Sequence, residues 1–482
     1  MAIVLAIDAG TTGVRTLAID ETGRPVGWRY REFAQHYPRP GWVEHDAEEI
    51  WAAVQQTMAE LRAALDQPIA AIGITNQRET VVIWDRRTGR PLHRAIVWQD
   101  RRTADRCTQL EADGQLPLVR DRTGLVLDPY FSATKLAWLF TDGGIELTPD
   151  VAAGTVDAWL LWKLTGEHVT DTTNASRTSL FDIRSLAWSD DLCDLFGVPR
   201  SVLPEVRPTC GRFGSTVDGI PVAGVAGDQQ AALFGEACIQ PGMAKNTYGT
   251  GSFVLMNVGA ACPPPVDGLL TTVAWTLDGE PGATYAFEGA VFVTGAAVQW
   301  LRDELRIIDD AAETEALAAS ITSTDGVYVV PAFAGLGSPW WDPYARGTVV
   351  GITRGTGRAH LARAVLESMA FQTRDVVDVM TASSGHPIVA LRADGGASDN
   401  ALLLQLQADQ LGVPVQRPVV RETTALGAAY LAGLAEGVWS SLDEVTRQWR
   451  LDVEVTPSID RPTADAAHAT WLRAVERARA WV

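Results

Sequence analysis

The chain has 482 residues, 46% hydrophobic and 21% charged, which is typical of a folded globular protein with two or three domains. It carries 40 basic against 59 acidic residues. The resulting formal net charge of −19 repels nucleic acid and anionic lipid, so we exclude both as partners. The five cysteines are widely spaced and form no CxxC pair, which excludes a disulfide framework or zinc site and favours a reducing cytoplasm. We expect no signal peptide and no membrane span, because no apolar run approaches ~18 residues.

The amino-terminal segment predicts a hairpin followed by a helix. Residues 3–8 and 14–20 are rich in β-branched and aliphatic side chains, and they flank the turn sequence Gly-Thr-Thr-Gly. Apolar residues then recur at helical spacing over residues 45–65. Asp46 and Glu49 have the spacing of a capping box at the start of that helix.

Strands and helices continue to alternate along the chain, which predicts the α/β class. The expected strands lie at residues 70–75, 80–85 and 326–333, and the expected helices at 360–380 and 424–437. The second of these helices is rich in small residues, which suits close packing. Residues 388–412 predict a strand, a Gly-Gly turn and a helix.

The middle of the chain repeats the opening pattern. Residues 221–235 predict a strand, a Gly-Asp turn and a helix, and residues 243–259 predict a strand, Gly-Thr-Gly and a second strand. A Gly/Thr hairpin therefore opens each half of the chain. We expect two similar domains facing each other across a cleft, with residues 1–237 in the first and 238–482 in the second.

The opening turn has two interpretations. It is neither a GxxxxGK[ST] loop nor a GxGxxG turn before a helix, so it matches no common phosphate motif. It is either a plain hairpin or a phosphate site built from free N–H groups and threonine hydroxyls. In the second case Asp8 stands where a metal ion bridging phosphates needs a carboxylate.

Three further stretches are candidates for chemistry, each with a plain alternative. Asp228, after a Gly at a strand-to-helix turn, is either a helix cap or a general base. Arg78 and Glu79 form either a structural ion pair or, buried, a set of partners for the hydroxyls of a small polyol. The Gly-Gly turn at 395–396 is either a tight connection or a surface for a flat ligand.

Together these stretches resemble the FGGY carbohydrate kinases and, among them, the glycerol kinases. The resemblance runs over essentially the whole chain. It is carried by PGWVEHDAEEIW, GITNQRET, IVWQDRRT, TGLVLDPYFSATK, TNASRTSLF, GDQQAALFG, GMAKNTYGTGSF, EGAVFVTGA, VPAFAGLGSPWWDPYARG and ETTALGAAYLAGL. It implies two actin-like, RNase H-like ATPase domains of the actin/Hsp70/hexokinase superfamily.

The resemblance also implies site residues, position by position. For a glycerol pocket it implies Arg78, Glu79, Trp98, Tyr130, Asp228, Gln229 and Phe253, with Asp228 as catalytic base. For the phosphates of the nucleotide it implies Thr11, Thr12, Arg15, Gly249 and Thr250, and for further nucleotide contacts Gly295, Gln299, Gly396 and Asn400. Asp8 is implied as the carboxylate that holds Mg²⁺ through water.

The implied activity is phosphorylation of glycerol by MgATP in the cytoplasm, with a homodimer or homotetramer as the expected assembly. A kinase for another polyol or ketose, such as erythritol or xylulose, is the alternative within the enzyme class. An actin- or Hsp70-like assembly or chaperone ATPase is the alternative from another class, because fold by itself does not set function.

Two features depart from the family pattern. Its first hairpin usually reads Asp-Gln-Gly-Thr-Thr-Ser, whereas this chain has Ala9 and Gly13, so two side-chain donors near the phosphates are lost. The loop 213–221 is short and lacks both the fructose 1,6-bisphosphate stretch and the phosphorylatable histidine of some relatives. We expect altered nucleotide affinity and neither form of control.

Overall fold

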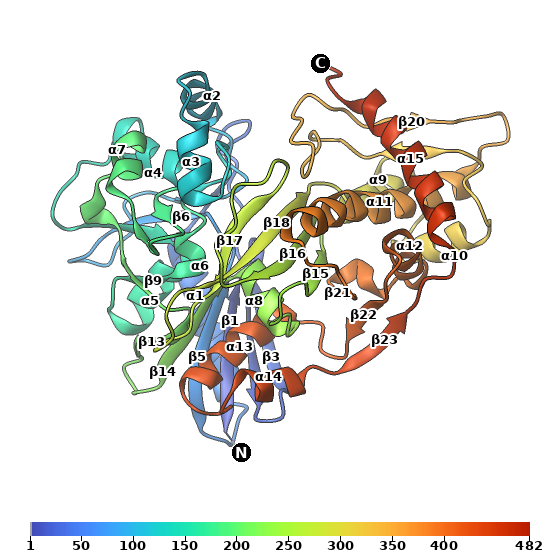
Figure 1. Cartoon of the computed structure of the whole chain (residues 1–482). Coiled ribbons are helices and arrows are strands. Elements are labelled where there is room, and N and C mark those ends of the chain that lie inside the picture. The colour runs from blue at the N-terminus through green and yellow to red at the C-terminus, as the bar shows by residue number, and fades with distance from the viewer. Residues whose placement is uncertain (1) are drawn as a thin grey trace.

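The computed structural model describes residues 2–482. A six-stranded mixed sheet forms the core of the amino-terminal half (Figure 1). Its strands, in spatial order, are β13 (Cys210–Ser215), β14 (Pro221–Gly227), β5 (Ile69–Asn76), β1 (Ile3–Ala9), β2 (Gly13–Asp20) and β3 (Pro25–Glu32). A seven-stranded sheet follows, in the order β17 (Leu270–Trp275), β18 (Thr284–Val291), β16 (Ser252–Gly259), β15 (Ala244–Tyr248), β21 (Leu391–Asp394), β22 (Val415–Pro418) and β23 (Leu451–Val455).

The two sheets share one plan. The strands β3-β2-β1 and β18-β16-β15 pair antiparallel, and β1 and β15 each continue into two parallel neighbours, β5-β14 and β21-β22. An antiparallel strand, β13 or β23, closes the series on each side. The predicted duplication of an α/β domain is thereby confirmed. The boundary between residues 237 and 238 stays a prediction.

Smaller sheets and the helices surround these cores. The remaining strands are β4 (Glu44–His45), β6 (Val81–Asp85), β7 (Ala95–Ile96), β8 (Val151–Thr155), β9 (Val169–Asp171), β10 (Phe181–Asp182), β11 (Ala187–Trp188), β12 (Glu205–Arg207), β19 (Tyr328–Val330) and β20 (Thr348–Val350). The α-helices are α1 (Ala47–Arg62), α2 (Ala104–Ala112), α3 (Leu116–Thr123), α4 (Ser132–Thr141), α5 (Val156–Thr165), α6 (Thr172–Ala175), α7 (Asp190–Phe196), α8 (Asp228–Gly235), α9 (Gly295–Asp303), α10 (Glu313–Ala319), α11 (Arg358–Ser384), α12 (Ala401–Leu411), α13 (Thr423–Ala435), α14 (Leu442–Gln448) and α15 (Arg461–Ala478).

The small-residue helix α13 returns from the carboxyl-terminal part of the chain to pack on the first sheet, beside α8 (Figure 1). Glycines make this approach possible. A methyl group on Gly427 would lie 1.8 Å from the carbonyl oxygen of Ala231, and one on Gly73 would lie 2.1 Å from that of Ala428. The predicted close packing of this helix is confirmed.

The start of α1 differs from the prediction. The Asp46 carboxylate accepts the Glu48 N–H at 2.9 Å and caps the helix as expected. Glu49, however, accepts the backbone N–H of Ala34 at 3.1 Å. The predicted capping box between Asp46 and Glu49 is therefore wrong, because the backbone N–H of Ala34, in the segment before the helix, takes up the Glu49 carboxylate.

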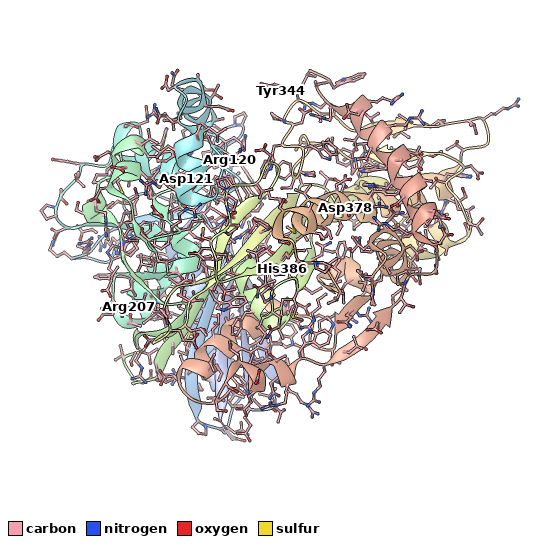
Figure 2. The ribbon with its side chains drawn as sticks, in the orientation of Figure 1. Arg120, Asp121, Arg207, Tyr344, Asp378 and His386 are labelled. Carbon is pink, nitrogen blue, oxygen red and sulfur yellow. The ribbon has the colours of Figure 1, made fainter. Side chains whose placement is uncertain are left out.

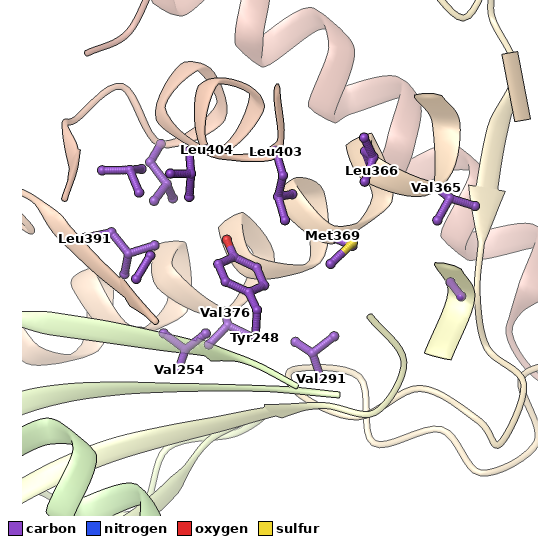
Figure 3. Packing of buried hydrophobic residues seen from close by; sticks show 14 of the residues in the cluster. Tyr248, Val254, Val291, Val365, Leu366, Met369, Val376, Leu391, Leu403 and Leu404 are labelled. Atoms are coloured by element: carbon purple, nitrogen blue, oxygen red, sulfur yellow. The ribbon is translucent and has the colours of Figure 1, made fainter. Parts of the chain in front are cut away.

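The core of the second half lies between its sheet and the long helix α11 (Figure 3). Val254 and Val291 of the sheet, with Met369 and Val376 of α11, are buried in this cluster. Tyr248 ends β15 within it and donates its hydroxyl to Gln407 at 2.8 Å. The turn between β15 and β16 is therefore anchored to the buried core. Within residues 2–482 we find no helix with the length and apolar character to cross a membrane.

Candidate functional site

The first Gly/Thr turn joins β1 to β2 with its tip at the surface. Gly10 N–H donates to Gly13 O at 3.0 Å and closes the turn. Thr12 is exposed and Thr11 is partly exposed, and the indole N–H of Trp98 donates to Thr11 Oγ1 at 3.0 Å. The structure therefore brings the predicted polyol residue Trp98 next to the predicted phosphate turn.

A relay of hydrogen-bonded side chains supports this turn; Gln77 and His45 are buried, and Gln35 is partly buried. Gln77 donates to Gly10 O at 3.0 Å, and Gln35 donates to Thr11 O at 2.9 Å. His45 lies between the two amides, with Nε2 2.7 Å from Gln35 Oε1 and Nδ1 3.3 Å from Gln77 Nε2. Gln77 donates to Nδ1, so the proton of the neutral ring is on Nε2, and burial lowers the pKa of His45 to about 4.

Sequence reasoning missed this relay. The three side chains come from separate segments, and only the contacts in the folded chain join them. Because the carbonyl groups of Gly10 and Thr11 are held by hydrogen bonds, the N–H groups of the turn keep one orientation. Fixed N–H groups are what the binding of an anion requires.

The second Gly/Thr turn, between β15 and β16, is built in the same way. Gly249 and Thr250 are exposed, and Gly249 N–H donates to Gly251 O at 2.8 Å. Their carbonyl groups accept the N–H groups of Gly295 (3.1 Å) and Ala296 (3.0 Å) at the start of α9. A methyl group on Gly295 would lie 2.5 Å from Gly249 O, so this contact requires glycine.

The remaining predicted nucleotide residues lie on surfaces around this turn. Gln299 is exposed one turn further along α9. Gly395, with a φ of 83°, lies against β15, since a side chain there would meet Tyr248 O at 2.3 Å. Gly396 beside it is exposed and open, and Asn400 caps α12 by accepting Leu403 N–H at 2.9 Å. The predicted strand, Gly-Gly turn and helix are confirmed.

Four buried charged residues form a closed set of ion pairs that we call the charge ring: Arg78, Glu79, Arg177 and Glu288. Glu288 accepts two hydrogen bonds from Arg78, at 2.6 and 3.0 Å, and one from Arg177 at 2.9 Å. Arg177 in turn donates to Glu79 at 2.7 Å, and Glu79 lies 3.8 Å from Arg78. Although burial by itself favours the neutral acid, Arg177 and Arg78 hold the pKa of Glu288 at about 2.

The ring joins the two halves of the protein, because Glu288 belongs to β18 of the second sheet. Sequence reasoning found Arg78 and Glu79 but missed Arg177 and Glu288. A signal was present in YAFEGAVFV, where a single carboxylate interrupts an apolar run. Such a residue is seldom buried without a partner of opposite charge.

Asp228 lies at the first position of α8, directly after β14. Its Oδ1 is 3.0 Å from Arg78 Nε and accepts the Gln229 N–H at 2.7 Å. The side chain is still 33% exposed, so the carboxylate is oriented and accessible at once. Gln229 is buried and accepts a hydrogen bond from Lys245.

Aromatic rings gather around Arg78. The rings of Trp98 and Tyr130 meet edge to face with centroids 5.6 Å apart, and Arg78 donates to the Tyr130 hydroxyl at 3.4 Å. The Phe253 ring centroid lies 5.8 Å from the Arg78 guanidinium carbon. The structure therefore assembles charged, amide and aromatic groups in one place, a combination that suits a small polyhydroxy ligand.

Asp8 is the second-last residue of β1, at the end of the sheet where β14 leads into Asp228. Burial, and next the nearby Asp228 charge, raise the pKa of Asp8 to about 7, and Arg15 offsets this only in part. Arg15 also lies 3.6 Å from Glu422.

A divalent cation suits the partly exposed Asp8, because it would relieve the repulsion between the two carboxylates. Within residues 2–482, no group of three or more acidic, histidine or cysteine side chains could hold a metal ion. The donor set fits Mg²⁺, which commonly takes one or two carboxylates together with water and substrate phosphates.

Two sheets of one plan, each carrying an exposed Gly/Thr turn, define the actin-like class of two-domain ATPases. The model of the FGGY family of carbohydrate kinases matches residues 3–235 with its N-terminal domain and residues 244–436 with its C-terminal domain. The chain belongs to this family.

Similar full-length proteins are known. The chain is 53% identical to a glycerol kinase of Carboxydothermus hydrogenoformans, over 99% of this chain and 98% of the relative. It is 56% identical to a glycerol kinase of Bordetella parapertussis, over 99% and 97%. The crystal structure of Plasmodium falciparum glycerol kinase with ADP matches with a TM-score of 0.93 and 37% identity, over 99% of this chain and 98% of that one.

Proposed function

We propose that this protein is a glycerol kinase, which transfers the γ-phosphoryl group of ATP to glycerol and yields ADP and sn-glycerol 3-phosphate. Full-length relatives of that name share more than half of its residues. The observation that carries the proposal is the Asp228 carboxylate, which Arg78 orients at 3.0 Å while a third of the side chain stays exposed. A general base needs both orientation and access.

Asp228 acts on the terminal hydroxyl of glycerol. One carboxylate oxygen is held by Arg78 and the Gln229 N–H, which leaves the other to accept the hydroxyl proton. As the O–H bond breaks, the glycerol oxygen forms a bond to the γ-phosphorus, and the bond from that phosphorus to the β–γ bridging oxygen breaks in line. The proton ends on Asp228 and ADP leaves with the electron pair.

Charged residues and aromatic side chains bind glycerol together. Arg78 and Glu79 present charged groups to the hydroxyls, and their orientation is fixed by Arg177 and Glu288. Trp98, Tyr130 and Phe253 cover the carbon skeleton, and Gln229 supplies an amide. Because these groups are positioned before the substrate arrives, little reorganisation remains for the reaction.

The two turns bind the phosphates. Thr11, Thr12 and Arg15 act from the first domain, and Gly249 and Thr250 act from the second. Gly295, Gln299, Gly396 and Asn400 contact the rest of the nucleotide. Fixed N–H groups and hydroxyls stabilise the charge on the moving phosphoryl group, which is the main source of catalysis in phosphoryl transfer.

Asp8 would hold Mg²⁺ through water, and the ion would supply positive charge that offsets the charge of the phosphates. Burial and the nearby Asp228 raise the pKa of Asp8 to about 7, and a cation beside this carboxylate would favour its ionised form.

The proposal is tested by measuring ADP release from MgATP with glycerol, erythritol, xylulose, ribulose and gluconate supplied in turn. We expect the highest kcat/KM for glycerol and little ADP release without an acceptor. A higher kcat/KM for another acceptor would show that glycerol is not the preferred substrate. Rapid ATP hydrolysis without any polyol would favour an assembly or chaperone ATPase.

We also propose that the enzyme works in the cytoplasm as a homodimer or homotetramer, as the family resemblance implies. Light scattering coupled to gel filtration measures the assembly. A monomer at micromolar concentration would remove the second part of this proposal.

A further inference from the structure

Strand β3 lies unusually close to the first Gly/Thr turn. A methyl group on Gly13 would lie 2.5 Å from the backbone oxygen of Arg31, 2.7 Å from the Tyr30 hydroxyl oxygen and 2.8 Å from Tyr30 Cε2. Distances below about 3 Å between such atoms are repulsive. Glycine at position 13 therefore allows β3 to approach, and Tyr30 fills the space that a side chain there would need.

Tyr30 lies near two of the three predicted phosphate-binding residues of the first domain, Thr12 in the turn and Arg15 in β2. Its hydroxyl lies 3.4 Å from Thr12 Oγ1. The guanidinium carbon of Arg15 lies 5.7 Å from the Tyr30 ring centroid and 5.9 Å from that of Trp28, within the range of cation–π attraction. Tyr30 is 36% exposed, so the phenol is accessible at the tip of the turn.

We propose that Tyr30 is a phosphate-binding residue of the first turn. Its hydroxyl donates a hydrogen bond to the terminal phosphates of the nucleotide, in place of the donor that Gly13 lacks, and its ring steadies Arg15. A phenol suits this role, since it is a neutral donor and phosphate oxygens are charged acceptors. The inference rests on the proposed kinase function, because it assigns Tyr30 to that same nucleotide site.

The first test removes only the hydroxyl. Tyr30→Phe keeps the ring against Gly13 and Arg15, so the variant should keep the Tm of the parent enzyme. Loss of a hydrogen bond to a charged group predicts that the Kd for ADP and the KM for ATP rise about tenfold or more. The affinities for AMP, which lacks the terminal phosphates, and for glycerol should stay unchanged.

Tyr344→Phe is the matched control. Tyr344 is 60% exposed and lies in the carboxyl-terminal half, at the upper edge of Figure 2, and its backbone groups pair with Asp342 and Trp481 rather than with either turn. The control should change none of these affinities. An unchanged Kd for ADP in Tyr30→Phe, or an equal loss for ADP, AMP and glycerol, would overturn the proposal and leave Tyr30 a packing role.

The second test exchanges the two positions. Tyr30→Ala should weaken ADP binding, and Gly13→Ser should do so as well, because its side chain meets Tyr30 and Arg31. In the double variant the two contacts with Tyr30 are gone, and only the backbone oxygen of Arg31 still lies close to the serine. The loss of ADP affinity caused by Gly13→Ser should therefore be smaller in the Tyr30→Ala background than in the parent enzyme, whereas additive losses would contradict the exchange.

Separate experiments distinguish a failure of the Tyr30 proposal from a failure of the proposed kinase function. Calorimetric binding of ADP needs no phosphoryl acceptor, so it tests Tyr30 whatever the acceptor is. Glycerol-dependent ADP release by the unaltered enzyme tests the kinase function separately.

Discussion

The contacts of Glu288 in the charge ring allow us to predict the loss of unfolding free energy in the variant Glu288→Gln. The change keeps the shape of the side chain but leaves Arg78 and Arg177 buried without their shared carboxylate. Arg177 and Arg78 overcome the effect of burial and hold the pKa of Glu288 at about 2, against an ordinary value of 4.5. By linkage this difference corresponds to about 3 kcal/mol of stability at neutral pH. Removing one partner of a buried pair typically costs ~3–5 kcal/mol, so both routes give the same size of loss.

The pH dependence carries a definite sign. A carboxyl whose pKa is lower in the folded state stabilises the protein above the pKa of the unfolded chain. That contribution is lost as pH falls from 4.5 through about 2. The difference between the parent and Glu288→Gln should therefore be complete at pH 7 and shrink by about half near pH 3.

Urea unfolding followed by the fluorescence of the 17 tryptophans measures this difference at each pH. Asp267→Asn is the matched control, because Asp267 lies 2.7 Å from Arg120 (labelled in Figure 2) but is 96% exposed. Its loss should stay below ~1 kcal/mol. If Glu288→Gln costs no more than this control, or if its cost is the same at every pH, the account of the ring is wrong.

Three further predictions concern Asp8, the relay that supports the first Gly/Thr turn, and the contact between α13 and α8. The folded state raises the pKa of Asp8 from 3.8 to about 7, so its ionised form opposes folding as pH rises through this range. Asp8→Asn should raise the Tm of the ligand-free protein at pH 8 while it weakens magnesium-dependent turnover; a lower Tm would contradict the assignment. His45→Ala removes the bridge between the two amides of the relay and should raise the KM for ATP about tenfold with little change for glycerol, a split that steady-state kinetics reveals. Equal changes in both KM values would instead indicate general damage. Gly427→Ala places a methyl group 1.8 Å from Ala231 O and should lower the free energy of unfolding by ~1–3 kcal/mol in urea, whereas Gly355→Ala, whose nearest neighbour is 3.8 Å away, should be almost neutral.

Local patterns predicted the elements that local chemistry determines. Alternating apolar and turn residues located β1, β2, β15 and β16, and the small residues of α13 predicted close packing but not that the partner would be the first sheet. The repeat of a Gly/Thr hairpin was enough to predict two domains of one plan. These features depend on neighbours within a few positions, so they are visible in the sequence.

The charge ring and the relay were not predictable in this way. Glu288 is 210 residues from Arg78 and 111 from Arg177, and no local pattern records such a pairing. The capping box failed for the same reason, since Ala34, 15 residues before Glu49, competes for its carboxylate. Tertiary partners decide where a polar side chain donates or accepts.

Gly13 shows a third case, in which the sequence located a feature but not its surroundings. The comparison with the family pattern predicts a lost donor at this position. The structure adds that Tyr30 of the neighbouring strand lies against Gly13, and this neighbour becomes visible only after β3 pairs with β2.

The central claim is that Asp228 takes the proton of the glycerol hydroxyl during phosphoryl transfer. Transfer of labelled γ-phosphate from ATP to glycerol by Asp228→Asn tests it most directly, because asparagine retains the acceptor for the Gln229 N–H but is not a base. The account predicts a fall in kcat of about 10²–10⁴-fold, with calorimetric affinities for ADP and glycerol close to those of the parent enzyme. Transfer at nearly the parent rate would contradict the claim.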